Sequence, residues 1–191
     1  MRILGATLPA RDPQALADWY ASRIGRVPVA FEPGEASPQH LAFHVGDLAA
    51  WRARLPVPLL RDGDGNDEFD FAGWDGARSI YFDDPEGNVI ELVARPDERP
   101  ELSLAEVGLP TTDVGAAVDA LERELGLPQY DGDRSSFSAV GDPDGLLIVV
   151  AGGRGWFPSR VRAGDAAVSV RIAGEPAELI LPGSRHRVTA A

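Results

Sequence analysis

A single carboxylate, Glu91, interrupts an apolar stretch of strand length at Val89–Val93. Side chains alternate along a strand, so Glu91 shares one face with Val89 and Val93 while its immediate neighbours take the other face. A carboxylate buried on such a strand must be paired, protonated or bound to a metal ion. On an edge strand the same residue would simply face water, and the residues alone leave both interpretations open.

The stretch that carries Glu91 is predicted to pair with the apolar run Ser79–Asp83 as a β-hairpin. Between the two runs lies Asp84–Gly87, in which proline presets one backbone dihedral angle and glycine frees another. The turn chemistry therefore positions Glu91 on the second strand of the hairpin.

Composition excludes several kinds of chemistry. The chain has 191 residues, no cysteine, and 18 basic residues that are all arginine. Thiolate nucleophiles, disulfides, Schiff-base lysines and Walker-type phosphate lysines are therefore excluded. The formal net charge of -12 argues against non-specific nucleic-acid binding and favours cationic small-molecule partners.

Targeting signals are also lacking. No apolar run reaches the ~18 residues of a membrane span, and the first residues lack the pattern of a secretory signal. We expect a cytoplasmic protein with a small-molecule ligand and no membrane or nucleic-acid partner, either a monomer or a homodimer.

Three helices are predicted, each opened by a capping aspartate. They run from Asp12 to Ile24, from Asp47 to Leu55 and from Asp113 to Leu125. Each follows a short strand, and Leu8–Asp12 matches Leu109–Asp113 at a constant offset. The chain is therefore built from repeated strand–helix units.

The repeated units differ in completeness. The first has room for only one short strand after its helix, whereas the second has three. The third repeats the hairpin turn at Asp142–Gly145, and Val149 takes the place of Glu91 when counted from the turn aspartate, so this unit has lost its acid. The tail contains two alternating strands without a helix, and the preceding pair Trp156-Phe157 is expected to be exposed.

Two motifs resemble the vicinal oxygen chelate superfamily, which includes glyoxalase I, extradiol dioxygenases and the fosfomycin and bleomycin resistance proteins. They are His40-Leu41-Ala42-Phe43 with the cap at Asp47, and Tyr81-Phe82-x-Asp84-Pro85-x-Gly87-Asn88-x-x-Glu91. The resemblance implies an α+β fold of repeated βαβββ modules that form cupped mixed sheets, with a divalent metal in the cup and with the first and last modules shortened. It also implies one module pair over residues 1–95, a linker over 96–102 and a second, degenerate pair over 103–191.

In that superfamily a metal ligand often lies on the first strand of a module, seven residues before the capping aspartate. The corresponding positions here are Gly5, His40 and Glu106, and the glutamate that follows the hairpin turn is Glu91. The resemblance therefore implies His40 and Glu91 as metal-binding and catalytic residues for Fe, Mn, Zn or Mg, whereas Gly5 cannot bind. This ligand set is incomplete, and Glu106 completes it only if the second and third modules share a cup.

We predict the other pairing, in which the first and second modules share the cup. Only the short loop from Pro33 to Pro38 joins them, and sequential units usually neighbour one another. This pairing predicts that Glu106 lies elsewhere and that the isolated chain holds a metal weakly or not at all.

Aromatic residues at strand spacing surround the candidate cup. Phe69, Phe71, Trp74 and Tyr81 are predicted to form a substrate wall, with ordinary sheet packing as the alternative. His44 shares the strand face of His40, but at ~3.3 Å per residue the two lie about 13 Å apart. We therefore predict His44 as a pocket wall or surface residue rather than a ligand.

Two functions fit these residues. The first is a metal enzyme of the lyase, isomerase or dioxygenase type, whose metal chelates adjacent oxygens of a small substrate and stabilises the oxyanion that forms. The second is a metal-free protein resembling the bleomycin resistance proteins, which sequesters a cationic ligand in an aromatic cup. His40 and Glu91 favour the first function, and the gap at Gly5 favours the second.

Overall fold

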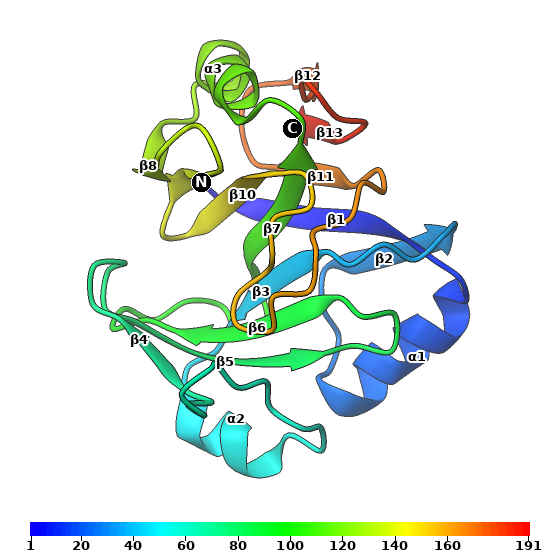
Figure 1. Ribbon diagram of the computed structural model, residues 1–191, viewed down its shortest axis with the longest axis vertical. Helices are drawn as coiled ribbons and strands as arrows, with labels where there is room; N and C mark the ends of the chain where they lie inside the picture. Colours follow the sequence, from blue (N-terminus) through cyan, green and yellow to red (C-terminus); the bar gives the residue numbers. More distant parts are fainter.

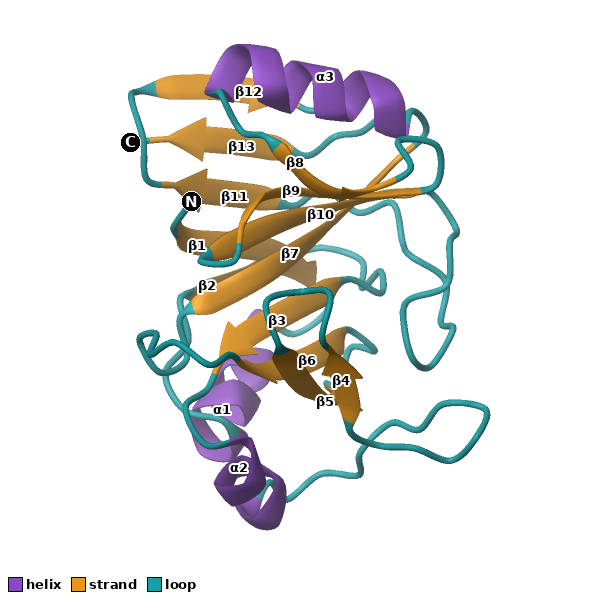
Figure 2. Ribbon diagram, turned by 90° about the vertical axis from the view of Figure 1, so that its left-hand side faces the viewer, coloured by secondary structure: helices purple, strands orange, loops and turns teal.

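The computed structural model describes all residues 1–191, which form two mixed sheets and three helices (Figures 1 and 2). The helices are α1 (Pro13–Arg23), α2 (Leu48–Arg54) and α3 (Val114–Leu125). Helices α1 and α2 lie at one end of the molecule and α3 at the other. None of the helices is long and apolar enough to cross a membrane.

The larger sheet has eight strands in the order β4-β5-β6-β3-β7-β10-β9-β8. Its strands are β3 (His40–His44), β4 (Phe69–Phe71), β5 (Ala77–Asp83), β6 (Val89–Ala94), β7 (Leu104–Thr111), β8 (Gln129–Gly132), β9 (Phe137–Asp142) and β10 (Gly145–Ala151). The smaller sheet has five strands in the order β12-β13-β11-β1-β2. They are β1 (Ile3–Ala10), β2 (Val29–Pro33), β11 (Ser169–Ile172), β12 (Ala177–Ile180) and β13 (Arg187–Ala190).

The helix starts follow the predicted caps. Asp12, Asp47 and Asp113 each accept a hydrogen bond from the backbone N–H three residues later, which satisfies one of the free donors of the first turn. The last helix ends at Gly126, whose left-handed φ of 64° suits a residue without a side chain. The predicted α+β class with repeated modules is confirmed.

The eight-stranded sheet is built from the second and third modules. Strand β3 of the second module pairs in parallel with β6 and antiparallel with β7, the first strand of the third module. The central strands β6, β3 and β7 therefore carry the residues of both modules side by side. The strand before Asp47 and the strand that carries Glu91 are therefore neighbours in one sheet.

The predicted pairing of the first module with the second is wrong. Strand β1 of the first module pairs with β11 of the last module in the five-stranded sheet. The physical reason lies in strand number. The second and third modules each contribute four strands to the larger sheet, whereas the two shortened modules can bury their apolar residues, such as Leu8 and Val170, only by completing one another.

The hairpin of the third module is offset from the hairpin of the second. Asp83 pairs with Val89 across a five-residue connection, whereas Asp142 pairs with Gly145 across two residues. Counting from the turn therefore misplaces the equivalent of Glu91 by one residue. Val149 lies in the core, and Ile148 lines the cavity instead.

The main hydrophobic core contains 33 buried residues from both sheets and all three helices. A second cluster lies on the opposite, concave face of the larger sheet and includes Tyr81, Ile148 and Trp156. The concave face is therefore apolar around the centre of β6, β3 and β7, where the acidic residues lie.

Candidate metal centre

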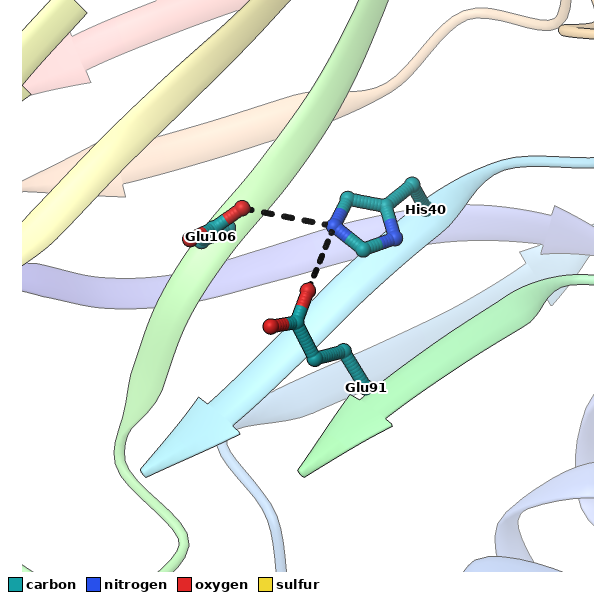
Figure 3. A group of neighbouring side chains, drawn as sticks. All are labelled: His40, Glu91 and Glu106. Carbon is teal, nitrogen blue, oxygen red and sulfur yellow. Dashed lines mark hydrogen bonds and ion pairs between the residues drawn. The ribbon is translucent and has the colours of Figure 1, made fainter. Parts of the chain in front are cut away.

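Three side chains converge at the middle of the eight-stranded sheet, one from each central strand (Figure 3). The Nε2 atom of His40 lies 3.4 Å from Oε2 of Glu91 and 3.4 Å from Oε2 of Glu106. One ligating atom from each residue lies within 4.8 Å of the others, and all three residues are buried. The predicted approach of His40 and Glu91 is confirmed, and the prediction that Glu106 lies elsewhere is wrong.

Register explains why the three residues meet. On β3, Ala42 pairs with Glu91 of β6 on one side and with Glu106 of β7 on the other. His40 lies two residues before Ala42 and therefore on the same face. Because Ala42 is small, the two carboxylates can lean across it toward His40. Glu91 is on an interior strand and only 4% exposed, so the edge-strand alternative is excluded.

The electrostatics of the triad favour shared protons or a shared cation. Burial, reinforced by the charge of Glu106, raises the pKa of Glu91 to about 7, although His40 opposes the rise. Burial lowers the pKa of His40, but the hydrogen bond to Glu106 and the charges of Glu91 and Glu106 outweigh it and raise this pKa overall. The protonation of each of these groups therefore depends on the charge of the others.

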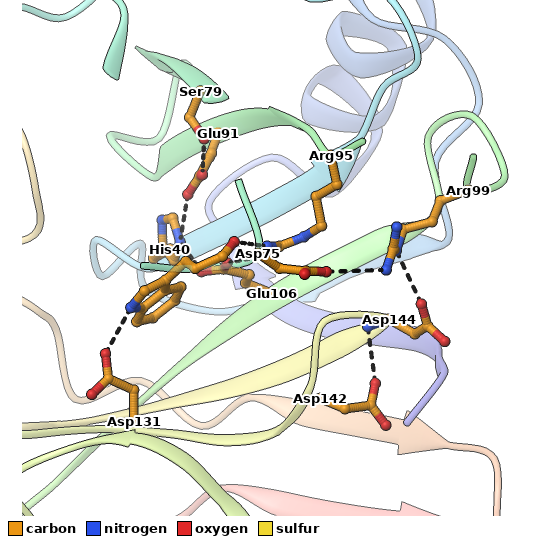
Figure 4. Close-up of polar contacts among 11 residues, drawn as sticks. His40, Asp75, Ser79, Glu91, Arg95, Arg99, Glu106, Asp131, Asp142 and Asp144 are labelled. Carbon is orange, nitrogen blue, oxygen red and sulfur yellow. Dashed lines mark hydrogen bonds and ion pairs between the residues drawn. The ribbon is translucent and has the colours of Figure 1, made fainter. Parts of the chain in front are cut away.

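Further side chains orient the triad (Figure 4). The Ser79 hydroxyl donates a hydrogen bond to Oε1 of Glu91, and the Arg95 guanidinium lies 3.6 Å from Oε1 of Glu106. Arg95 also donates to the backbone carbonyl of Trp74 at 2.7 Å. Each carboxylate therefore has one oxygen held by a neighbour and the other turned toward His40.

The triad forms part of the wall of a cavity of about 160 Å³. Aromatic and aliphatic side chains dominate the remaining wall, which is lined by Phe71, Trp74, Ala77, Tyr81, Phe137, Ile148, Trp156 and Phe157, together with Arg95 and Arg154. Of the predicted wall, Phe71, Trp74 and Tyr81 line the cavity. Phe69 lies behind it and packs edge-on against Tyr81 and Phe157.

His44 does not line this cavity. It lies on β3 beyond the triad and faces a different cavity with Arg95 and Arg99. Gly5 and His186 also lie outside the centre. Gly5 faces a groove of the five-stranded sheet, and His186 is a buried structural residue that donates from Nε2 to the Pro110 carbonyl at 2.8 Å.

Trp156 is buried, contrary to the expectation of an exposed Trp156-Phe157 pair. Its ring lies 5.5 Å from the His40 ring at 31°, and its Nε1 donates to the Pro38 carbonyl at 3.1 Å. A Cβ atom on Gly108 would lie only 2.6 Å from the Trp156 ring, so the glycine makes room for this packing. Nothing in the loop sequence indicates this position, because the contacts come from β3 and β7.

The donor set suits a divalent cation. One imidazole nitrogen and two carboxylates would supply three protein ligands, as catalytic sites commonly have, and the cavity beside them leaves room for a substrate or water. This mixture of nitrogen and oxygen donors suits Mn, Fe, Zn or Mg better than a soft ion. Glu106 therefore lies where it would complete the ligand set that appeared incomplete in the sequence.

Comparisons with solved structures support the fold. The chain is similar to a candidate dioxygenase from Bacillus subtilis subsp. subtilis str. 168, with a TM-score of 0.64 and 17% identity over 100% of this chain and 85% of the other. It is also similar to glyoxalase I from Zea mays, with a TM-score of 0.59 and 14% identity over 99% of this chain and 91% of the other. No protein-family model and no curated protein matches the sequence. The chain therefore shares the fold of these two proteins, which is the fold that its motif resemblance implied.

Proposed function

We propose that the chain is a divalent-metal-dependent enzyme of the lyase, isomerase or dioxygenase type, acting on a small substrate with adjacent oxygen atoms. The observation that carries this proposal is the convergence of His40, Glu91 and Glu106 beside an apolar cavity. Similarity to a candidate dioxygenase and to glyoxalase I supports the general type of chemistry. A dioxygenase and glyoxalase I catalyse different reactions, so the similarity to both supports the type of site rather than one particular reaction.

Each residue of the centre has a proposed task. His40, Glu91 and Glu106 would hold the cation, which when bound would act as a Lewis acid on the substrate oxygens. Ser79 and Arg95 fix the two carboxylates, so the ligands need little reorganisation.

Tyr81 is a proton donor close to Glu91. It lies opposite Glu91 on the neighbouring strand and lines the cavity. Burial, with the charges of Glu91 and Glu106, raises the pKa of Tyr81 well above its usual value. The phenol therefore stays protonated near neutral pH and can donate a hydrogen bond to a substrate oxygen.

The alternative is a metal-free protein that sequesters a ligand, as the bleomycin resistance proteins do. The gap at Gly5 favours this function only if Gly5 faces the metal cup. In the structure Gly5 belongs to the other sheet, and Glu106 lies where it would supply a third ligand. The aromatic wall remains compatible with both functions, so metal content separates them.

The first prediction concerns metal content. The protein purified without chelator, loaded with Zn or Mn and dialysed, should contain about one metal ion per chain by elemental analysis. Because each residue supplies one of three ligands, His40→Ala and Glu106→Ala should each lower metal affinity by roughly 10-fold to 100-fold or more. Glu178→Ala, which removes an exposed carboxylate on β12, is the matched control and should retain the metal.

Two results would contradict the proposal. One is a wild-type chain that retains no metal while binding cationic ligands in the cavity, which would favour the sequestering function. The other is a Glu106→Ala variant that is folded and holds metal as tightly as the wild-type chain.

A further inference from the structure

A second cavity, of about 260 Å³, lies where β3 and β6 end. It is lined by His44 at the end of β3, by Val45 and Gly46 after it, and by the segment Arg95–Arg99 after β6. Arg95 lines both this cavity and the cavity of the metal centre, so its side chain stands between them. None of the three candidate metal ligands lines the second cavity.

Two residues that line the second cavity carry buried hydrogen-bonding atoms without partners. Five buried side-chain polar atoms in the chain lack a hydrogen bond, and three of them are Nδ1 and Nε2 of His44 and Nε of Arg95. His44 is 3% exposed and the Arg95 side chain 1%. The Asp144 backbone approaches the His44 ring without making a hydrogen bond of ordinary geometry. Buried polar atoms that stay unpaired destabilise the folded chain, so these atoms favour a hydrogen-bonding guest in the cavity.

The charges around the cavity favour an anion. The Arg99 side chain is 12% exposed, and its guanidinium is held by Asp144 at 3.0 Å and, more loosely, by Asp75 at 4.0 Å (Figure 4). Both aspartates are largely exposed, so their charges are screened by water. Glu106, at 3.6 Å, is the one carboxylate paired with Arg95, whose guanidinium also donates to the Trp74 carbonyl at 2.7 Å. Asp97 and Glu98 also line the cavity, but both are exposed to solvent.

His44 can serve as a neutral donor in this setting. Burial, followed by the charges of Arg95 and Arg99, lowers the pKa of His44 to about 4, although the Asp144 backbone and Glu106 oppose the shift. Near neutral pH the ring therefore carries one N–H donor. Two guanidinium groups and one imidazole N–H are typical partners of a carboxylate or phosphate group.

We propose that the second cavity is a binding site for a small oxyanion group, a carboxylate or a phosphate, held by His44, Arg95 and Arg99. The proposal does not rest on the proposed metal chemistry, because these residues bind the anion with or without a metal ion nearby. The alternative is that only water occupies the cavity, and the following experiment distinguishes water from an oxyanion.

Isothermal titration of the metal-free full chain with inorganic phosphate, and separately with acetate, tests the site at neutral pH and constant ionic strength. Metal-free protein is used because phosphate can also bind a metal ion. We expect saturable binding of at least one anion at one site per chain. Arg99→Gln should weaken that binding about tenfold or more, since it removes one of the two cationic partners.

Two further variants keep the test decisive. Arg154→Gln is the matched control, because Arg154 lines only the cavity of the metal centre, and it should leave anion affinity unchanged. His44→Leu should also weaken binding, and circular dichroism shows whether each variant is folded. If neither anion binds saturably, or if Arg154→Gln weakens binding while Arg99→Gln does not, the proposal is overturned.

Discussion

At the scale of single residues, the His40 imidazole is fixed by contacts on its faces and at its edge. The ring of Trp156 lies 5.5 Å from it and the ring of Tyr81 6.5 Å from it, both roughly parallel to it. Glu91 and Glu106 meet the same nitrogen, Nε2. Such packing limits ring rotation, so the nitrogen that a cation needs is already oriented.

The second prediction concerns Ser79, which orients Glu91. Ser79→Ala should lower metal affinity by about 10-fold to 100-fold while leaving all three ligands in place. The expected cause is a Glu91 carboxylate that has lost the hydrogen bond to one of its oxygens. Competition with a coloured zinc chelator measures the change.

Ser138→Ala provides the control for this prediction. Ser138 is equally buried but lies on β9, where its hydroxyl accepts from the Arg134 backbone. Equal metal affinity in the two variants would show that Ser79 has no orienting role.

The sequence predicted single residues unevenly. His40 and Glu91 could be predicted because each lies within a local motif, seven residues before a cap or after a hairpin turn. The position of Glu106 in the chain was predicted by the same count, but its place in space depends on the pairing of β3 with β7. Trp156 and Arg95 were missed because their roles come from contacts with distant strands.

At the scale of elements, the loop between β10 and β11 closes one side of the metal cavity. It carries Arg154, Trp156 and Phe157, which all line the cavity. Phe157 packs edge-on against Phe69 at 4.7 Å, and Trp156 reaches across to Pro38. The loop therefore shields the triad from water.

The third prediction tests the packing of this loop on β7. Gly108→Ala should destabilise the protein by about 1–3 kcal/mol, because the new methyl group would overlap the Trp156 ring. Urea unfolding measures the change. Gly63→Ala is the control, since a Cβ atom there meets nothing within 4 Å, and it should change stability by less than about 0.5 kcal/mol. Equal stability of the two variants would mean that Trp156 does not occupy this place.

The fourth prediction concerns pH and the contact between the last module and β7. His186 accepts from the Val168 backbone N–H at Nδ1 and donates to the Pro110 carbonyl at Nε2, so it must be neutral. Burial lowers the pKa of His186 from 6.5 to about 4, although the hydrogen bond to Pro110 opposes the shift. Between these two values the unfolded chain binds a proton that the folded chain does not, so stability falls as pH drops from 6.5 toward 4.

The expected loss from His186 is about 2–3 kcal/mol between pH 7 and pH 4.5. In His186→Gln the total loss over this range should be smaller by about that amount. His186→Gln should still lose some stability over this range, because the pKa of His44 is also lowered to about 4. Urea unfolding at the two pH values measures it. An unchanged pH dependence in His186→Gln would contradict the assignment of the neutral ring.

At the scale of the whole molecule, the outer modules pair with one another and the inner modules pair with one another. The module type, the helices and their caps could be predicted from local signals such as Asp47 and the turn Asp84–Gly87. The pairing of the modules could not be predicted in this way. The rule that sequential units neighbour one another takes no account of the number of strands in each module. The same pairing that moves Gly5 to the smaller sheet brings Glu106 to His40.

We propose that this pairing creates a metal centre from His40, Glu91 and Glu106. Anomalous diffraction from crystals of the metal-loaded chain, collected on both sides of the absorption edge of the metal, would locate the bound ion. We predict one strong peak per chain at about 2.0–2.2 Å from His40 Nε2 and from one oxygen of each glutamate. A metal-loaded crystal with no peak at this position, or with its only peak beside other residues, would contradict the claim.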